Sequence, residues 1–111
     1  MKLLIAGSRG INNFSLAEYV DKDVDLIVSG GAKGVDTIAE DYADKNGVSK
    51  LILRPDYKKY GKAAPLKRNE EMVALCDAVL VIWDGVSKGT KYTADFAVKA
   101  GKEVHVIRLE K

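Results

Sequence analysis

The sequence predicts a three-layer α/β domain built on a doubly wound, five-stranded parallel sheet with the strand order 3-2-1-4-5. Two observations carry this prediction. Five short runs rich in branched apolar residues recur along the chain, and segments with helical spacing lie between them. Strict alternation of strands and helices implies parallel strands joined by right-handed crossovers. Because 111 residues suffice for one hydrophobic core but not for two, we expect a single domain over residues 1–111.

The apolar runs define the expected strands, which are Leu3–Ala6, Asp25–Ser29, Leu51–Leu53, Ala78–Trp83 and Val104–Leu109. Most of these runs are apolar at consecutive positions, as is typical of a parallel sheet covered on both faces. A first helix is expected to begin at Ser15, where Glu18 completes a capping box and Phe14 with Tyr19 forms a hydrophobic staple. The other helices are expected from Val35 to near Gly47, from about Leu66 to Cys76, and from about Thr90 to Ala100.

Composition excludes several classes of protein. The single cysteine, Cys76, and the single histidine, His105, rule out a disulfide scaffold and a zinc finger, so no metal and no resident cofactor are expected. A formal charge of +2 is far from the strongly basic balance of a dedicated duplex-DNA binder. No apolar run approaches the roughly 20 residues of a membrane span, and the N-terminal run is too short for a signal peptide. We therefore expect a cytoplasmic protein without a membrane partner.

Glycine-containing loops follow the first, second and fourth expected strands, at residues 7–10, 30–34 and 85–90. Glycine permits positive φ and close backbone approach, and the helix that follows offers free amides, so such loops suit a phosphate. In doubly wound sheets, ligands bind where the strand order reverses, here between strands one and four. A short turn between strand and helix can also need glycine for its geometry alone. The candidate ligand-binding residues of these loops are Gly7, Ser8, Arg9, Gly30, Gly31, Lys33, Gly34, Asp36, Ser87, Gly89 and Thr90.

The third expected helix adds the pair Arg68 and Asn69 to the candidate site. Arg68 lies near the start of the helix, where a cation gains nothing from the helix dipole, so a phosphate or carboxylate partner is favoured. Asn69 shares a stripe with Leu66 and Val73 and should face the interior, where its amide either contacts a ligand or bonds loop carbonyls. Two roles are open for Asp36 as well: it stabilises the dipole of its helix, or it binds a ribose or a neighbouring loop.

Common nucleotide signatures do not occur, because the chain contains neither Gly-x-Gly-x-x-Gly nor Gly-x-x-x-x-Gly-Lys-Ser/Thr. A standard dinucleotide dehydrogenase and a P-loop NTPase are therefore disfavoured. A serine hydrolase is disfavoured as well, because no Gly-x-Ser-x-Gly elbow is identified and because His105, within the last expected strand, is interpreted as a packing residue and leaves a triad without an evident base. The only local basic cluster spans residues 54–68, where Tyr57 and Tyr60 are interleaved with lysines and arginines. It is a lid over a nucleotide, a contact surface for single strands, or a solvated loop.

Four motifs in order along the chain resemble those of the SLOG superfamily, especially its small stand-alone YspA-like branch. These are Gly7-Ser8-Arg9, the segment 28–39 with its Ser-Gly-Gly-Ala-x-Gly-Val-Asp run, Arg68-Asn69-x-x-Met72, and Ser87-Lys88-Gly89-Thr90. The resemblance implies a Rossmann-like nucleotide-binding fold. It is shared by the DNA-processing Smf proteins, whose domain binds single-stranded DNA, and by the LONELY GUY phosphoribohydrolases, which release bases from nucleoside monophosphates. Relatives in this superfamily commonly self-associate, so a homo-oligomer is expected.

The phosphoribohydrolase pattern is incomplete in this sequence. Arg68 matches its active-site arginine, but the position of its catalytic glutamate is occupied by Thr93. Asp95 lies two residues further along, about 200° around the helix, and does not substitute for it. Arg68 and Asp84 remain the only weak candidates for catalytic residues. We therefore expect binding or sensing of a nucleotide-derived ligand, with N-glycosidic hydrolysis and single-stranded DNA binding as alternatives; the base and the number of phosphates are not readable from the sequence.

Overall fold

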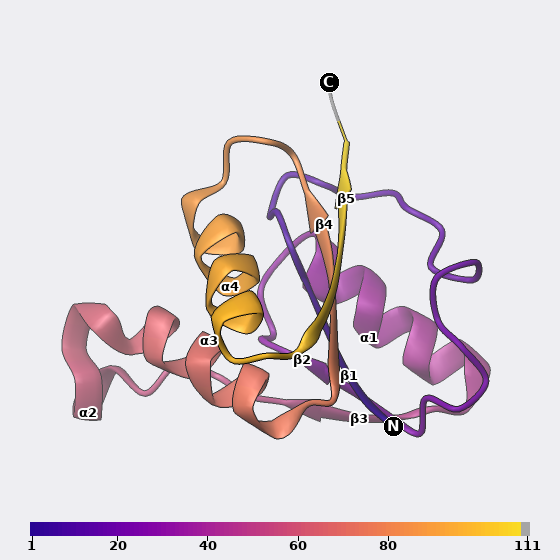
Figure 1. Cartoon of the computed structure of the whole chain (residues 1–111), viewed down its shortest axis with the longest axis horizontal. Helices are drawn as coiled ribbons and strands as arrows, with labels where there is room; N and C mark the ends of the chain where they lie inside the picture. The colour runs from indigo at the N-terminus through magenta and orange to yellow at the C-terminus, as the bar shows by residue number, and fades with distance from the viewer. Residues whose placement is uncertain (110–111) are drawn as a thin grey trace.

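The computed structural model describes residues 1–109 and contains one five-stranded sheet in which all strands are parallel. The strands are β1 (Lys2–Gly7), β2 (Leu26–Ser29), β3 (Ser49–Ile52), β4 (Ala78–Trp83) and β5 (Glu103–Arg108). Their order is β3-β2-β1-β4-β5, as predicted. The two central strands pair from Leu3 with Ala78 to Gly7 with Ile82, so their carboxyl ends are level. The reversal of strand order therefore lies between the ends of β1 and β4 (Figure 1).

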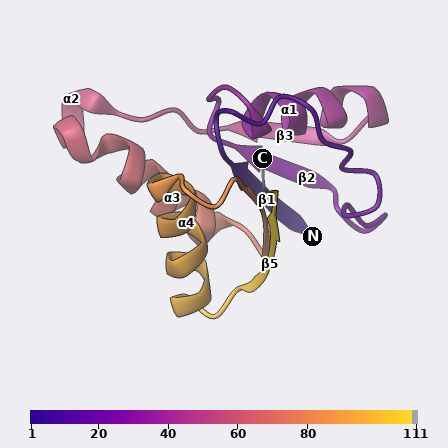
Figure 2. The same ribbon diagram turned by 90° about the horizontal axis from the view of Figure 1, so that it is seen from above.

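Helices cover the sheet on both faces, which confirms the three-layer α/β fold. They are α1 (Val35–Asn46), α2 (Tyr57–Tyr60), the 3₁₀ helix η1 (Gly61–Ala63), α3 (Ala64–Leu75) and α4 (Lys88–Lys99). Seen from above, α1 lies on one side of the sheet and α3 and α4 lie on the other, while α2 projects from the body (Figure 2). Gly47 ends α1 in the left-handed conformation with φ 66°. Within residues 1–109, no helix has the length and hydropathy needed to cross a membrane.

The predicted helix at Ser15 is wrong. Residues 8–25 form an irregular segment in which the amides of Tyr19 and Val20 both bond the Leu16 carbonyl, making a single turn. The contact expected of the hydrophobic staple does form, since the Phe14 and Tyr19 rings stack with centroids 5.5 Å apart. The segment is held by Ile11, Leu16 and Val24, which are buried against the sheet. Ile11 and Leu16 are five positions apart, about 140° around a helix, so a helix would not place both on the same face, whereas the irregular segment buries both.

The core lies on both faces of the central strands. One cluster joins β1 and β4 to α1 and to the irregular segment 8–25, and the other joins them to α3 and α4. Consecutive residues of β1, β2 and β4 are buried, which confirms the expectation of two covered faces for these strands. The edge strands differ, since Leu51 in β3 is 41% exposed and Val106 in β5 is 45% exposed. Edge strands have a neighbour on one side only, and the helices cover them less completely.

The buried face of α3 also differs from the predicted stripe. Its buried residues are Ala64, Arg68, Met72 and Val73, whereas Leu66 is 39% exposed and Asn69 is only partly buried. The observed stripe follows the i, i+4, i+8 spacing of Ala64, Arg68 and Met72. The prediction missed this phase because it did not assign a charged residue to the interior.

Candidate functional site

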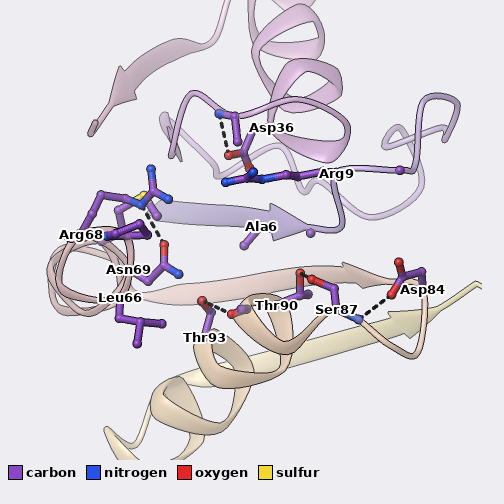
Figure 3. A pocket seen from close by; sticks show the side chains of 16 residues that line it. Ala6, Arg9, Asp36, Leu66, Arg68, Asn69, Asp84, Ser87, Thr90 and Thr93 are labelled. Atoms are coloured by element: carbon purple, nitrogen blue, oxygen red, sulfur yellow. Dashed lines mark hydrogen bonds between the residues drawn. The ribbon is translucent and has the colours of Figure 1, made fainter. Parts of the chain in front are cut away.

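A pocket with a volume of about 400 Å³ opens at the carboxyl ends of the strands, where the strand order reverses. The loops after β1, β2 and β4 form part of its wall, and α3 and the start of α4 complete it (Figure 3). Eight of the predicted ligand-binding residues line this pocket: Gly7, Arg9, Asp36, Arg68, Asn69, Ser87, Gly89 and Thr90. Asp84, the second weak candidate for catalysis, lines it too.

The other predicted site residues, Ser8, Gly30, Gly31, Lys33 and Gly34, do not line the pocket. Ser8 is buried, and its hydroxyl accepts a hydrogen bond from the Asp84 amide at 3.0 Å, which ties the β1 loop to the β4 loop. Lys33 is exposed. Gly34 has φ 75°, and a Cβ there would lie 2.4 Å from the Ser8 carbonyl oxygen. At Ser8 and Gly34, the observed contacts join the loops to one another.

Arg68 is the most buried cation of the site, at 9% exposure. Its Nη1 donates to the Gly30 carbonyl at 2.7 Å and to the Leu53 carbonyl at 3.3 Å, and its Nε donates to the Asn69 side-chain oxygen at 2.8 Å. Gly30 allows this approach, because a Cβ at that position would lie 2.8 Å from Nη1. Burial lowers the pKa of Arg68, and the nearby Asp36 carboxylate opposes that shift. The guanidinium thus joins α3 to the ends of β2 and β3.

Asp36 lies in the first turn of α1 and is also buried. Its carboxylate accepts a hydrogen bond from the Ala32 amide at 3.1 Å, which closes the β2 loop. Burial raises the pKa of the Asp36 carboxyl, whereas the Ala32 amide and the cation of Arg68 lower it. Figure 3 shows the Arg9 side chain running alongside this carboxylate on the same wall of the pocket. Arg9 itself is exposed, and its guanidinium makes no hydrogen bond within residues 1–109.

Hydrogen bonds made by its own side chains fix the conformation of the β4 loop. Asp84 Oδ1 accepts hydrogen bonds from the amides of Val86 and Ser87, both at 2.9 Å. The Ser87 and Thr90 hydroxyls lie 3.0 Å apart, so one donates to the other. Thr93 is buried, lines the pocket and donates to the Gly89 carbonyl at 3.0 Å. Thr93 occupies the position that corresponds to the phosphoribohydrolase glutamate, and its hydroxyl already donates a hydrogen bond to the Gly89 carbonyl.

The expectation that the chain lacks a Gly-x-Ser-x-Gly motif is wrong. Residues Gly85 to Gly89 match Gly-x-Ser-x-Gly, the pattern that carries the nucleophile of α/β-hydrolases on a strained turn between strand and helix. Here Ser87 does lie between β4 and α4, but its backbone has φ −64° and ψ 116°, which is unstrained. The chain's single histidine, His105, lies on β5 with its ring against Tyr19. His105 is therefore not placed to act as a base for Ser87.

The α3 wall also contributes residues that were not predicted to lie in the site. Pro65, Leu66 and Met72 line the pocket opposite the loops. With Ala6 and Ala32, they provide apolar surface beside the polar groups of the site. An apolar residue on a helix looks the same in the sequence whether it faces a core or a pocket, so no sequence signal distinguished them.

Most of the basic cluster 54–68 lies on or next to the arm made of α2 and η1, which projects from the body of the domain (Figure 2), whereas Lys67 and Arg68 lie in α3. Tyr57 is 60% exposed at its tip, and Lys59 lies over the Tyr60 ring at 5.1 Å. Asp56 caps α2 by accepting from the Lys59 amide. Arg54 is exposed and donates to the Gly31 carbonyl at 3.3 Å. The arm therefore presents cations and the Tyr57 ring to solvent.

Comparison with known proteins gives a family match and a viral relative. Residues 1–60 match the family described as the YspA, cpYpsA-related SLOG family. The gene 61 protein of Mycobacterium phage D29 is 38% identical over 82 residues, an alignment that covers 68% of this chain and 66% of the relative. The matched region is thus just under two thirds of that relative's length. No solved structure matches the chain.

Proposed function

Because the chain belongs to the YspA, cpYpsA-related SLOG family, we propose that its pocket binds a nucleotide or a nucleotide-derived ligand. The observation that carries this proposal is the position of the pocket at the reversal of strand order, enclosed by three glycine-containing loops. Its volume of about 400 Å³ falls within the range of small-molecule sites. The sheet edge at such a reversal is the usual ligand site of doubly wound folds.

The polar groups of the pocket suit the parts of a nucleotide. Arg9 offers an exposed guanidinium, and Gly89 and Thr90 lie in the first turn of α4, where amides and the helix dipole favour an anion. Asp36 offers a carboxylate on the same wall as Arg9, across the pocket from α4 (Figure 3), and carboxylates accept hydrogen bonds from sugar hydroxyls. We assign the phosphate to the first turn of α4, with the Arg9 cation facing it from the other wall, and the ribose to the Asp36 carboxylate.

A thermal-shift screen tests this proposal with nucleoside mono-, di- and triphosphates, ADP-ribose, NAD and cyclic dinucleotides. A ligand at about a hundredfold over its dissociation constant stabilises the fold by roughly 2.7 kcal/mol, or on the order of 10 °C for a domain of this size. The test variant is Arg9→Ala, because Arg9 makes no structural hydrogen bond within residues 1–109. Lys22→Ala, an exposed cation just before β2 at the other edge of the sheet, is the matched control.

A shift that Arg9→Ala abolishes and Lys22→Ala retains supports the proposal. If no compound shifts the melting temperature, the nucleotide pocket is ruled out for the classes in the screen.

Incubating the protein with the same compounds tests whether it hydrolyses any of them. We propose binding without hydrolysis because Thr93 stands where the phosphoribohydrolases carry their glutamate and its hydroxyl is bonded to Gly89. Chromatographic detection of free base above the background of a protein-free incubation would contradict that assignment.

Single-stranded nucleic acid is a second candidate ligand, favoured by the projecting arm. Lys58, Lys59 and Lys62 are exposed there beside the exposed Tyr57 ring, a combination that suits phosphates and stacked bases. Fluorescence anisotropy of a labelled oligonucleotide tests it, and binding should weaken steeply with salt. The triple variant Lys58→Ala, Lys59→Ala and Lys62→Ala should abolish the signal. An anisotropy that does not change on adding the protein excludes this candidate.

A further inference from the structure

Two neighbouring residues of α3 direct their side chains to different partners. Arg68 is buried and donates hydrogen bonds to the carbonyls of Gly30 and Leu53. Gly30 directly follows β2, and Leu53 directly follows β3. Asn69 is only partly buried and lines the pocket. The two side chains meet through a single hydrogen bond, in which Arg68 Nε donates to Asn69 Oδ1 at 2.8 Å.

This hydrogen bond fixes the orientation of the Asn69 amide. A guanidinium has donors and no acceptor, so only the oxygen of the amide can face Arg68 Nε. The amide nitrogen must then point to the other side. Figure 3 shows it turned away from Arg68, toward the open space between α3 and the start of α4. Within residues 1–109, Asn69 Nδ2 makes no hydrogen bond, so both of its protons are available.

We propose that Asn69 is the specificity-determining residue of the α3 wall and that its amide nitrogen donates a hydrogen bond to an acceptor atom of the bound ligand. This inference rests on the proposed function of the pocket. The acceptor is an oxygen of the sugar or phosphate, or an acceptor atom on the edge of a base. Arg9 on the facing wall and the amides at the start of α4 are donors as well, so the pocket selects a ligand rich in acceptors.

The substitution Asn69→Asp isolates this role. It keeps the shape of the side chain and keeps an acceptor for Arg68 Nε, but it replaces the donor in the pocket with a negatively charged acceptor. We expect the variant to melt at or above the temperature of the wild type and to bind its ligand at least roughly tenfold more weakly. Asn46→Asp makes the same chemical change at the exposed end of α1, far from the pocket, and should leave affinity unchanged.

Nuclear magnetic resonance of the ¹⁵N-labelled chain gives the readout. Separate titrations use AMP, GMP, CMP, UMP and ribose 5-phosphate, and the side-chain amide signals of Asn69 and the backbone signals of Gly89 and Thr90 are followed. Movement of the Asn69 signals together with weakened binding in Asn69→Asp supports the proposal. If ribose 5-phosphate produces the movement, the acceptor lies in the sugar phosphate. If only the nucleotides produce it, the acceptor lies in the base.

The two proposals fail in different ways. If Gly89 and Thr90 respond to a probe while Asn69 does not, and Asn69→Asp binds as tightly as the wild type, the role of Asn69 is overturned and the nucleotide pocket stands. If no pocket residue responds to any probe, both are overturned for these ligands. Should Asn69→Asp fail to fold, the titrations of the wild type alone decide between these outcomes.

Discussion

Replacing Arg68 with alanine should destabilise the fold substantially, and the structure gives the magnitude. Arg68 is 9% exposed and supplies three hydrogen bonds, to the carbonyls of Gly30 and Leu53 and to the Asn69 amide oxygen. Truncation leaves two carbonyls without this donor and removes the cation near Asp36. Losing one member of a buried polar network costs about 3 kcal/mol or more, even after the desolvation penalty of the guanidinium is recovered.

Such a loss is a large part of the total stability, which is about 6–16 kcal/mol for a chain of 111 residues. It corresponds to a fall in melting temperature of on the order of 10 °C. Urea unfolding followed by circular dichroism and by the fluorescence of Trp83, the single tryptophan, measures the free energy of unfolding directly.

Arg54→Ala is the matched control. Arg54 is also an arginine bonded to a loop carbonyl, that of Gly31 at 3.3 Å, but it is exposed. We expect its loss to cost less than about 0.5 kcal/mol, because water replaces the hydrogen bond. An Arg68→Ala variant that unfolds within about 1 kcal/mol of the wild type, or an Arg54→Ala variant equally damaged, would refute the structural role of Arg68.

Three further predictions concern other residues of the fold. Burial raises the pKa of the Asp36 carboxyl above its usual 3.8, so the folded state holds this proton more tightly than the unfolded state, and the contribution of Asp36 to stability falls as pH rises through the raised pKa. The stability of the wild type relative to Asp36→Asn, from urea unfolding, should therefore rise when pH is lowered from about 7 to about 4, and a constant difference contradicts this. Burial raises the pKa of the Cys76 thiol to about 11, so iodoacetamide should label it slowly in the native protein and quickly in urea; equal rates would mean that the thiol is accessible. Gly34→Ala should destabilise more than Gly47→Ala by at least about 1 kcal/mol, since both have positive φ but only Gly34 has no space for a Cβ; melting curves that coincide would show that the loops move apart freely.

The sequence by itself determined the class of fold and the edge at which the candidate site lies. Alternating apolar runs and helical segments leave few topologies for a single domain. Right-handed crossovers narrow these topologies further, and the strand order 3-2-1-4-5 is one that they permit. Because all strands are parallel, the loops after β1, β2 and β4 must meet at one edge. Apolar patterning and chain topology together therefore located the pocket without any long-range information.

Tertiary contacts explain why the predicted helix at Ser15 does not form. A capping box is worth about 1 kcal/mol, whereas burying each of Ile11, Leu16 and Val24 against the sheet contributes about 1.5–3 kcal/mol. The spacing of Ile11 and Leu16 is incompatible with a single helical face, so burial prevailed over the local signal.

The roles of Arg68 and Asn69 were also decided by contacts distant in sequence. The Gly30 carbonyl that Arg68 binds lies 38 residues away along the chain, so no local pattern indicates that this cation points inward. Once Arg68 is fixed there, its Nε sets which side of the Asn69 amide faces the pocket. A sequence gives the type of each hydrogen-bonding group, but the direction in which a group points depends on partners that only the folded chain brings together.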